Sequence, residues 1–241
     1  MRKKISLLHA TRGDFNRSVD VKNEWLDKAK NPDAIEHIFG FNKDDVMNDI
    51  FKYDKSHKHI VNKQKVGLGG DAVKNWNNCA SISNGELLFC IADDFHPFTN
   101  WDSVLLDKLG VRMYGFYVIS INDFDGGMHI SGNLDNEMNR DRLLCRHPIM
   151  TKSLYHTRGY VFYPSYSGFC CDNDLTIESL KRGYLLDFTE LTFKHEADIH
   201  KIFTKRAEPT ESFNILYNEK AQLKGSKLLT KRLKDFEKKY Q

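Results

Sequence analysis

Two adjacent carboxylates at the end of an apolar segment are the residues best suited to chemistry in this sequence. Residues 86–92 form the most strand-like apolar segment of the chain, and Asp93 and Asp94 follow it directly. Carboxylates beside a buried strand are costly unless a counter-charge lies next to them. Mg²⁺ or Mn²⁺ is a suitable partner, because these ions bind oxygen ligands and often share their coordination with substrate phosphates. A solvated turn is the alternative interpretation of this pair.

A second acidic cluster follows the aromatic segment 160–169. Asp172 lies between this segment and a short helical pattern. Aromatic side chains often line small-molecule pockets, so a carboxylate at their edge is well placed to act as a general base for a hydroxyl group. A segment rich in Tyr and Phe suits a hydrophobic core equally well. Asp174 is expected to cap the helix that follows.

His195 is a candidate metal ligand because it follows a late strand-like segment. A single histidine more often has a structural role. The sequence contains no His-Glu-x-x-His, Gly-x-Ser-x-Gly or P-loop motif, and the glycines at 67–70 lack the dinucleotide-binding spacing. Zinc peptidases, serine hydrolases, P-loop NTPases and simple dehydrogenases therefore lose their strongest sequence support.

The elements that must position these side chains alternate between strands and helices. Strands are predicted at Ile5–Ala10, 35–41, His59–Asn62, 86–92 and 114–121. Helices are predicted at 19–30, at 72–80, around Leu105 and Leu106, and around 175–180. This alternation predicts an α/β fold with an open, mainly parallel sheet, in which ligands bind outside the carboxyl ends of the strands. The polar segment 122–139 is predicted to be a long loop over the site.

Three polar segments follow the ends of predicted strands. They are Thr11-Arg12-Gly13, Asp44-Asp45 and Asp93-Asp94. Because the carboxyl ends of parallel strands lie at one edge of a sheet, we expect these segments to converge there.

The composition indicates a folded protein. Hydrophobic residues make up 40% of the chain and charged residues 29%, which is enough apolar surface to form a core. The longest apolar run is far shorter than the roughly 20 residues of a membrane span.

Five cysteines without a Cys-x-x-Cys motif indicate reduced thiols, and the short apolar stretch after Met1 is not typical of a signal peptide. We therefore expect a cytoplasmic location.

The basic charge is concentrated at the C-terminal end. Residues 218–241 contain eight Lys or Arg and three acidic residues, a surplus of five, so the rest of a chain of net charge +3 sums to minus two. A basic body suited to nucleic acid is therefore absent. Leucines at helical spacing among the lysines predict an amphipathic helix, and we divide the chain into a catalytic domain at 1–212 and a basic helix at 213–241. Its leucine stripe is expected to pack on the core, with weak membrane-surface contact as the alternative.

The combination of segments resembles the GT-A nucleotide-sugar glycosyltransferases, and within them the inverting family-2-like enzymes. The matching segments are Leu-Leu-His-Ala-Thr-Arg-Gly at 7–13, Ala-Val-Lys-Asn-Trp-Asn at 72–77, Gly-Glu-Leu-Leu-Phe-Cys-Ile-Ala-Asp-Asp at 85–94 and Cys-Asp-Asn-Asp-Leu at 171–175. The Ala-Thr-Arg-Gly and Ala-Asp-Asp-Phe segments look particularly similar to the small glycosyltransferase domains of large algal viruses that decorate capsid glycans. The location implied by that likeness is the host cytoplasm.

The resemblance implies a role for each matching position. Asp172 stands where the family has its catalytic base, and Asp94 and His195 would hold Mn²⁺ or Mg²⁺ against the donor diphosphate. Asp93 would face the ribose or the sugar. The residues implied to bind the nucleotide-sugar donor are Thr11, Arg12, Asp44, Asp45, Lys74, Asn77 and Asp93.

The function implied is transfer of a sugar, with inversion, from a nucleoside-diphosphate sugar to a hydroxyl of a glycan or glycoprotein acceptor. UDP is the nucleotide that the resemblance favours. One alternative is a nucleotidyltransferase that makes the sugar nucleotide, although the Thr-Arg-Gly-Asp segment at 11–14 is a poor match to its Gly-rich phosphate loop. The other is a catalytically silent, sugar-binding module with the same fold.

Overall fold

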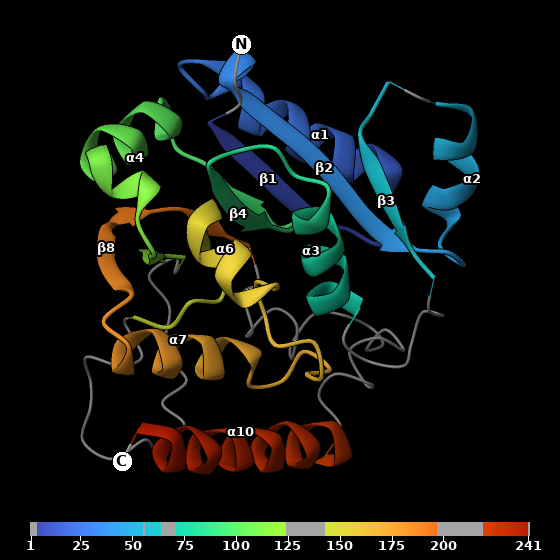
Figure 1. Ribbon diagram of the computed structural model, residues 1–241. Coiled ribbons are helices and arrows are strands. Elements are labelled where there is room, and N and C mark those ends of the chain that lie inside the picture. Colours follow the sequence, from blue (N-terminus) through green and yellow to red (C-terminus); the bar gives the residue numbers. More distant parts are fainter. Residues whose placement is uncertain (1–3, 55, 64–70, 124–142, 197–218, 241) are drawn as a thin grey trace.

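A seven-stranded mixed sheet forms the centre of the molecule, with strand order β3-β2-β1-β4-β7-β6-β8 (Figure 1). The computed structural model describes residues 4–54, 56–63, 71–123, 143–196 and 219–240. The strands are β1 Ile5–Ala10, β2 Ile35–Asn42, β3 His59–Asn62, β4 Leu87–Ile91, β6 Val118–Asn122, β7 Ile149–Thr151 and β8 Leu185–Thr192. Two shorter strands, β5 Phe95–His96 and β9 Lys194–His195, form a separate antiparallel pair.

Helices cover both faces of the sheet (Figure 1). The α-helices are α1 Phe15–Asp27, α2 Val46–Tyr53, α3 Asp71–Ser81, α4 Trp101–Leu109, α6 Lys152–Arg158, α7 Cys171–Lys181 and α10 Glu219–Tyr240, with short 3₁₀ helices at Pro32–Ala34 and Gly110–Tyr114. Alternate side chains of β1 enter different clusters: Leu7 packs with α1 and α4, whereas Leu8 packs with α3, α6 and α7. This period of two produces the layered arrangement.

Close contact between α3 and β2 depends on Gly40. A Cβ atom at this position would lie 2.7 Å from Cys79 Sγ and 2.9 Å from the Asn75 carbonyl oxygen. Only a residue without a side chain allows the helix to approach the strand this closely. The glycine therefore sets the position of the helix that carries Lys74 and Asn77.

The strand directions bring most of the polar segments to one edge of the sheet. β1 is parallel to β2 and β4, and β6 is parallel to β8, so their carboxyl ends lie on the same side. β7 is antiparallel to both β4 and β6, so its amino end lies there as well. Residues just after β1, β2, β4 and β6 and just before β7 therefore share this edge.

Most of the predicted elements are present, with changes at their ends. The first helix begins at Phe15 rather than at residue 19, because the side chain of Asp14 accepts a hydrogen bond from Arg17 N at 3.0 Å and caps it. The strand predicted at 114–121 begins only at Val118, because the preceding residues form a 3₁₀ turn closed by the amide of Gly115. The central part of the predicted long loop, residues 124–142, and the glycines at 67–70 lie outside the described residues.

The short strand β7 and the β5–β9 pair were not predicted. A segment of three residues is too short to show a period in the sequence. All five cysteines are unpaired, as predicted.

The C-terminal helix is present as α10 and lies beside α7 (Figure 1). The proposed boundary at 212 and 213 lies outside the described residues. The predicted leucine stripe is only part of the contact: Leu228 packs against the core, whereas Leu223 is 55% exposed. Gly225 lies against the backbone of Phe169, where a Cβ would be 2.7 Å from the carbonyl oxygen.

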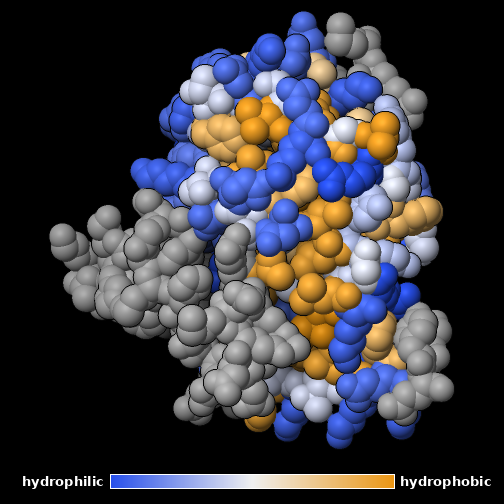
Figure 2. All heavy atoms as spheres, turned by 90° about the vertical axis from the view of Figure 1, so that its left-hand side faces the viewer, coloured by the Kyte–Doolittle hydropathy of each residue, from blue (hydrophilic) through white to orange (hydrophobic). Residues whose placement is uncertain are grey.

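Apolar side chains gather on the face that carries α4 and β8 (Figure 2). Val104 in α4 and the residues Val111 and Phe116, which lie between α4 and β6, are exposed apolar side chains. Among the helices that the structure describes, none has both the length and the apolar character needed to cross a bilayer.

Candidate functional site

The loops after β1, β2 and β4 meet at the carboxyl edge of the sheet. Thr11 Oγ1 donates a hydrogen bond to Asp93 Oδ2 at 2.8 Å, and the amide of Gly13 donates to both carboxylate oxygens of Asp45 at 3.1 and 3.2 Å. Asp45 also caps α2 through the amide of Met47. The three polar segments therefore converge as expected, and Asp45 acts as the bridge between two of them.

Two buried histidines form a hydrogen-bonded chain that ends at the carboxylate of Asp93. His9 Nε2 lies 2.9 Å from Asp93 Oδ1, and His9 Nδ1 lies 3.0 Å from His37 Nε2. Burial first, and then the nearby charges of His9, Lys22 and His57, lower the pKa of His37 well below its usual value.

The hydrogen-bond pattern assigns the tautomers of this chain. His37 Nδ1 is buried and has no hydrogen-bond partner among the described residues. A bare ring nitrogen is less costly there than an N–H group without an acceptor. We therefore assign the His37 proton to Nε2, from which it is donated to His9, and His9 in turn donates Nε2–H to Asp93. The carboxylate is thus fixed while its outer side remains partly exposed.

Asp94 faces His195 across the second, two-stranded sheet. Asp94 Oδ1 lies 3.5 Å from His195 Nε2, and the carbonyl of Asp94 accepts a hydrogen bond from the amide of Glu196 at 2.8 Å. The β5–β9 pair, in which Phe95 is opposite His195, brings together residues that are far apart in the sequence. The two metal-ligand candidates are therefore adjacent.

The donor set of Asp94 and His195 fits a divalent cation such as Mn²⁺. Burial disfavours the charged carboxylate, but the hydrogen bond and charge of His195, with His147 and Arg17 adding to them, lower the pKa of Asp94 to about 2. One carboxylate and one imidazole are ligands that Mn²⁺ accepts, and they leave coordination positions for phosphate oxygens. Among the described residues, no group of three or more His, Cys, Asp or Glu side chains is arranged to bind a metal without such help.

A second buried ion cluster extends the site towards β6 and β7. Asp123 accepts from Arg146 at 2.9 Å and pairs with His147 Nδ1 at 3.1 Å. The ring of His147 stacks on Phe95 with centroids 4.1 Å apart and meets the edge of His195 at 4.8 Å. His195, one of the two candidate metal ligands, is therefore packed against the ring of His147, which in turn is paired with Asp123.

Asp172 lies at the start of α7, within electrostatic reach of this cluster. The surrounding protein shields it from water and raises its pKa, although the amide of Asn173 and the charge of Arg146 act in the opposite direction. Asp172 Oδ1 accepts from that amide at 3.0 Å. A raised pKa makes this carboxylate a stronger proton acceptor than an ordinary Asp.

Asp174 is not the helix cap that its position in the sequence predicted. The helix begins at Cys171, so Asp174 lies inside its first turns, and both its carboxylate oxygens accept from Arg232 Nε at 2.9 Å. Its role is to hold α10 against α7. A carboxylate that binds a residue remote in the sequence cannot be distinguished from a cap by local pattern.

The other residues expected to bind the donor differ in their exposure and in whether their side chains are already hydrogen-bonded. Asn77 forms three hydrogen bonds, at 2.7 to 3.1 Å, with the backbone of Val161 and Phe162. It therefore positions the segment before α7 rather than presenting a free amide. Arg12 and Asp44 are exposed on loops at the carboxyl edge, and Lys74 is half-buried on α3.

The sequence pattern did not indicate four residues that belong to the candidate site: His9, Asp123, Arg146 and His147. One signal was available for Asp123, because it follows β6 in the same way that Asp93 follows β4. No such signal marked His147, since the short β7 that places it was not recognised.

No protein-family model matches the sequence, and no curated protein matches it. Solved structures do match its fold. The S. aureus TarS fragment 1–349 aligns with a TM-score of 0.56 at 13% identity over 90% of this chain and 72% of that fragment. The same fragment in complex with UDP-GlcNAc aligns with a TM-score of 0.56 at 14% identity over 95% of this chain and 71% of the fragment. Full-length TarS is covered over 43% of its length.

The structure of a second protein also matches the fold of this chain. The mannosyltransferase PcManGT from Pyrobaculum calidifontis, in complex with GDP-Man and Mn²⁺, aligns with a TM-score of 0.56 at 10% identity over 94% of this chain and 74% of that protein. At such identities the likeness concerns the fold. The chain therefore has the GT-A fold, with an open, mainly parallel sheet flanked by helices.

Proposed function

We propose that this chain is a metal-dependent glycosyltransferase that moves a sugar, with inversion, from a nucleoside-diphosphate sugar to a hydroxyl of a glycan or glycoprotein acceptor. The observation that carries the proposal is the contact between Asp94 and His195 at the carboxyl edge of a GT-A sheet. Asp172 provides a carboxylate with a raised pKa near the same edge. The structural neighbours bound to UDP, UDP-GlcNAc and GDP-Man support a nucleotide-sugar donor.

The donor end of the site is formed by the loops after β1, β2 and β4. Thr11 and Arg12 are proposed to lie beside the nucleotide, with Asp44 and Asp45 near its base and Lys74 towards the donor from α3. The Asn77 amide is bonded to the backbone of Val161 and Phe162, so Asn77 is proposed to support the donor site by holding that segment. Asp93 is held by His9 and Thr11 in one orientation, so that its outer side can accept a hydrogen bond from a ribose or sugar hydroxyl. Fixed acceptors of this kind orient the donor at little entropic cost.

Asp94 and His195 are proposed to hold Mn²⁺ or Mg²⁺. The bound cation would neutralise the charge that develops on the departing diphosphate. The Mn²⁺ in the PcManGT complex supports this choice of ion. The ring of His147, which Asp123 holds by a hydrogen bond, packs against the ring of His195.

Asp172 is proposed to act as the general base. Its carboxylate accepts the proton of the acceptor hydroxyl while the oxygen forms a bond to the anomeric carbon. The bond between that carbon and the diphosphate breaks on the opposite face, and the diphosphate leaves with the electron pair. This in-line displacement inverts the configuration, and its rate depends on holding both reactants in line.

Thermal unfolding in the presence of nucleotide sugars tests the proposal. Ligands that bind the native state raise the melting temperature. We expect UDP-glucose, UDP-GlcNAc or GDP-mannose to raise it with Mn²⁺ present and to have less effect in EDTA. Slow release of free sugar from the same donor would show turnover. No shift with any UDP-, GDP-, CMP- or dTDP-sugar would refute a nucleotide-sugar site, and a shift without turnover would indicate a silent module.

A further inference from the structure

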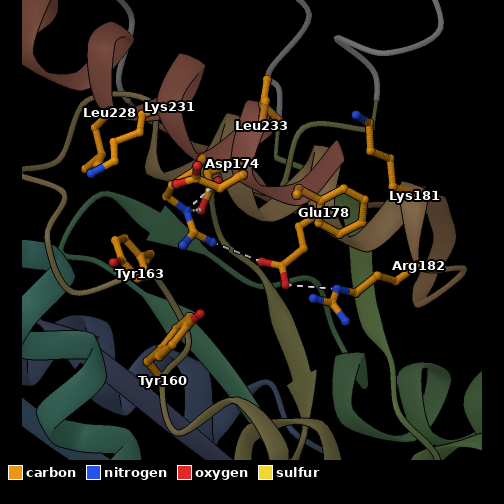
Figure 3. Close-up of a pocket in the computed structure, with 12 residues that line it drawn as sticks. Tyr160, Tyr163, Asp174, Glu178, Lys181, Arg182, Leu228, Lys231 and Leu233 are labelled. Carbon is orange, nitrogen blue, oxygen red and sulfur yellow. Dashed lines mark hydrogen bonds and ion pairs between the residues drawn. The ribbon is translucent and has the colours of Figure 1, made fainter. Parts of the chain in front are cut away.

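A pocket of about 290 Å³ lies between α7 and α10 (Figure 3). Its lining includes Tyr160, Tyr163, Asp174, Glu178, Lys231 and Phe236. Successive residues of an α-helix are separated by about 100°, so Asp172 and Asp174 point to opposite faces of α7. The pocket is therefore distinct from the catalytic face but begins at the same turn of the helix.

The two central carboxylates of the pocket are already neutralised by arginines. Asp174 binds Arg232 through both oxygens. Glu178 lies 3.2 Å from Arg158, 3.1 Å from Arg182 and 3.3 Å from Arg232. Figure 3 shows the ion pair between Glu178 and Arg182 among the residues that line the pocket. The carboxylates therefore have little capacity left to attract a cationic ligand.

The donor groups around the pocket, by contrast, are incompletely used. The Arg158 side chain is only 7% exposed, and none of its three nitrogens makes a hydrogen bond of good geometry among the described residues. The hydroxyl groups of Tyr166 and Ser179, on the same side of the sheet, also have no partner in that part of the chain. None of these three residues lines the pocket, so a guest meets only the donor groups of the lining itself, such as the exposed ammonium group of Lys231.

The charged and aromatic residues that line the pocket indicate which class of ligand it can bind. Four basic side chains line the pocket against three acidic ones: Lys181, Arg182, Lys231 and Arg232 against Asp174, Glu178 and Asp235. The surplus within the pocket is a single charge, and Lys231 is the exposed lysine that α10 contributes to the lining. Arg158 and Arg232 already stack on Tyr160 and Tyr163, at 4.9 and 3.7 Å from the ring centroids. The guanidinium groups are paired with Asp174 and Glu178, so the aromatic walls suit a hydroxylated ring and Lys231 supplies the positive charge for an acidic group on that ring.

We propose that this pocket binds an acidic sugar unit of the glycan acceptor. The identification of the guest as part of the acceptor rests on the proposed function, whereas the binding chemistry does not. Asp172 and the pocket are separated by about one helix width, roughly 10 Å. An acceptor longer than one sugar is therefore required to reach both.

Titration calorimetry at low salt with two probes of equal length tests this inference. Trigalacturonate carries carboxylates, and maltotriose is neutral. We expect the intact chain to bind trigalacturonate and to bind maltotriose at least tenfold more weakly. Lys231→Ala removes an exposed cation of the pocket and should weaken trigalacturonate binding about tenfold. Lys234→Ala is the matched control, because it removes the same charge from the same helix outside the pocket lining, and it should bind as the parent does.

Three results would overturn the inference: no binding of trigalacturonate, equal binding of maltotriose, or equal loss in both lysine variants. Both lysines are exposed, so their removal leaves the fold intact, which thermal unfolding checks. Binding of UDP and Mn²⁺ is measured on the same samples. If trigalacturonate binds but no nucleotide sugar does, the proposed function fails and the pocket remains a saccharide site. If nucleotide sugars bind and trigalacturonate does not, only the present inference fails.

Discussion

Asp94 Oδ1 lies 3.5 Å from His195 Nε2, and the contact exists because strands β5 and β9 pair. The two side chains are 101 positions apart in the sequence (195 minus 94), and neither has a metal-binding motif around it. Their contact provides the most direct test of the metal site.

Replacing Asp94 by Asn should abolish metal-dependent donor binding, because the amide lacks the charge that a divalent cation requires. The fold should remain, since the amide can still lie beside the imidazole. His195→Ala should weaken binding less, because the carboxylate stays. Calorimetry of UDP with Mn²⁺ measures both effects, with Asp27→Asn at the exposed end of α1 as the control. Unchanged Mn²⁺-dependent affinity in Asp94→Asn would refute the assignment.

Replacing Asp172 by Asn should lower kcat by roughly 10²- to 10⁴-fold with little change in donor affinity, because it removes proton acceptance and few donor contacts. The pKa of Asp172 is raised in the folded protein, so its ionisation costs stability as the pH rises through that pKa. The uncharged Asn variant avoids this cost, so at pH 7 it should melt at a temperature no lower than that of the parent. Loss of donor binding would instead place Asp172 in the nucleotide site.

The pH dependence of kcat/KM should report the same carboxylate. Activity requires the ionised form, so the rate should fall as the pH drops through a pKa above the usual Asp value of about 3.9. The charge of Arg146 lowers the pKa of Asp172. Arg146→Gln should therefore move the acidic limb to higher pH, whereas Arg182→Gln, on the pocket side of α7, should leave it in place. An acidic limb that moves to lower pH in Arg146→Gln would contradict this arrangement.

Asp174 should behave as a structural residue. Asp174→Ala leaves Arg232 without its two-oxygen partner, and we expect a loss of about 1.5–3 kcal/mol in the free energy of unfolding. Turnover should fall only as far as folding does. Urea unfolding and single-turnover rates measured on the folded fraction separate the two. If Asp174→Ala is inactive but fully folded while Asp172→Asn is active, the roles of the two carboxylates are reversed.

Gly40→Ala should destabilise the protein by about 1–3 kcal/mol, the usual cost of overpacking. The added methyl group meets Cys79 Sγ and the Asn75 carbonyl, so α3 must move away from β2. Cys79→Ala removes one of these obstacles and should restore part of the loss in the double variant. Thermal unfolding of the two single variants and the double variant gives the coupling energy between positions 40 and 79. If the two losses of stability simply add, the contact between the new methyl group and Cys79 Sγ is not the cause of the destabilisation.

The alternating α/β order, the first four strands of the sheet and the carboxylates at their ends follow from local sequence pattern. Hydrophobic period and strand-end position are local properties, so Thr11, Asp45 and Asp93 could be expected at one edge before any coordinates were known. The absence of a Cys-x-x-Cys motif, from which reduced thiols were expected, was local information of the same kind.

The contacts that depend on β7, β9 and α10 could not be read from local pattern, because they form only when distant segments pack together. Strands of two or three residues carry no readable period, yet they place His147 and His195 beside Asp94. Likewise, nothing local distinguishes a capping carboxylate from one that pairs with Arg232 in a distant helix. These residues acquire their roles through long-range pairing, which depends on the packing of the whole sheet.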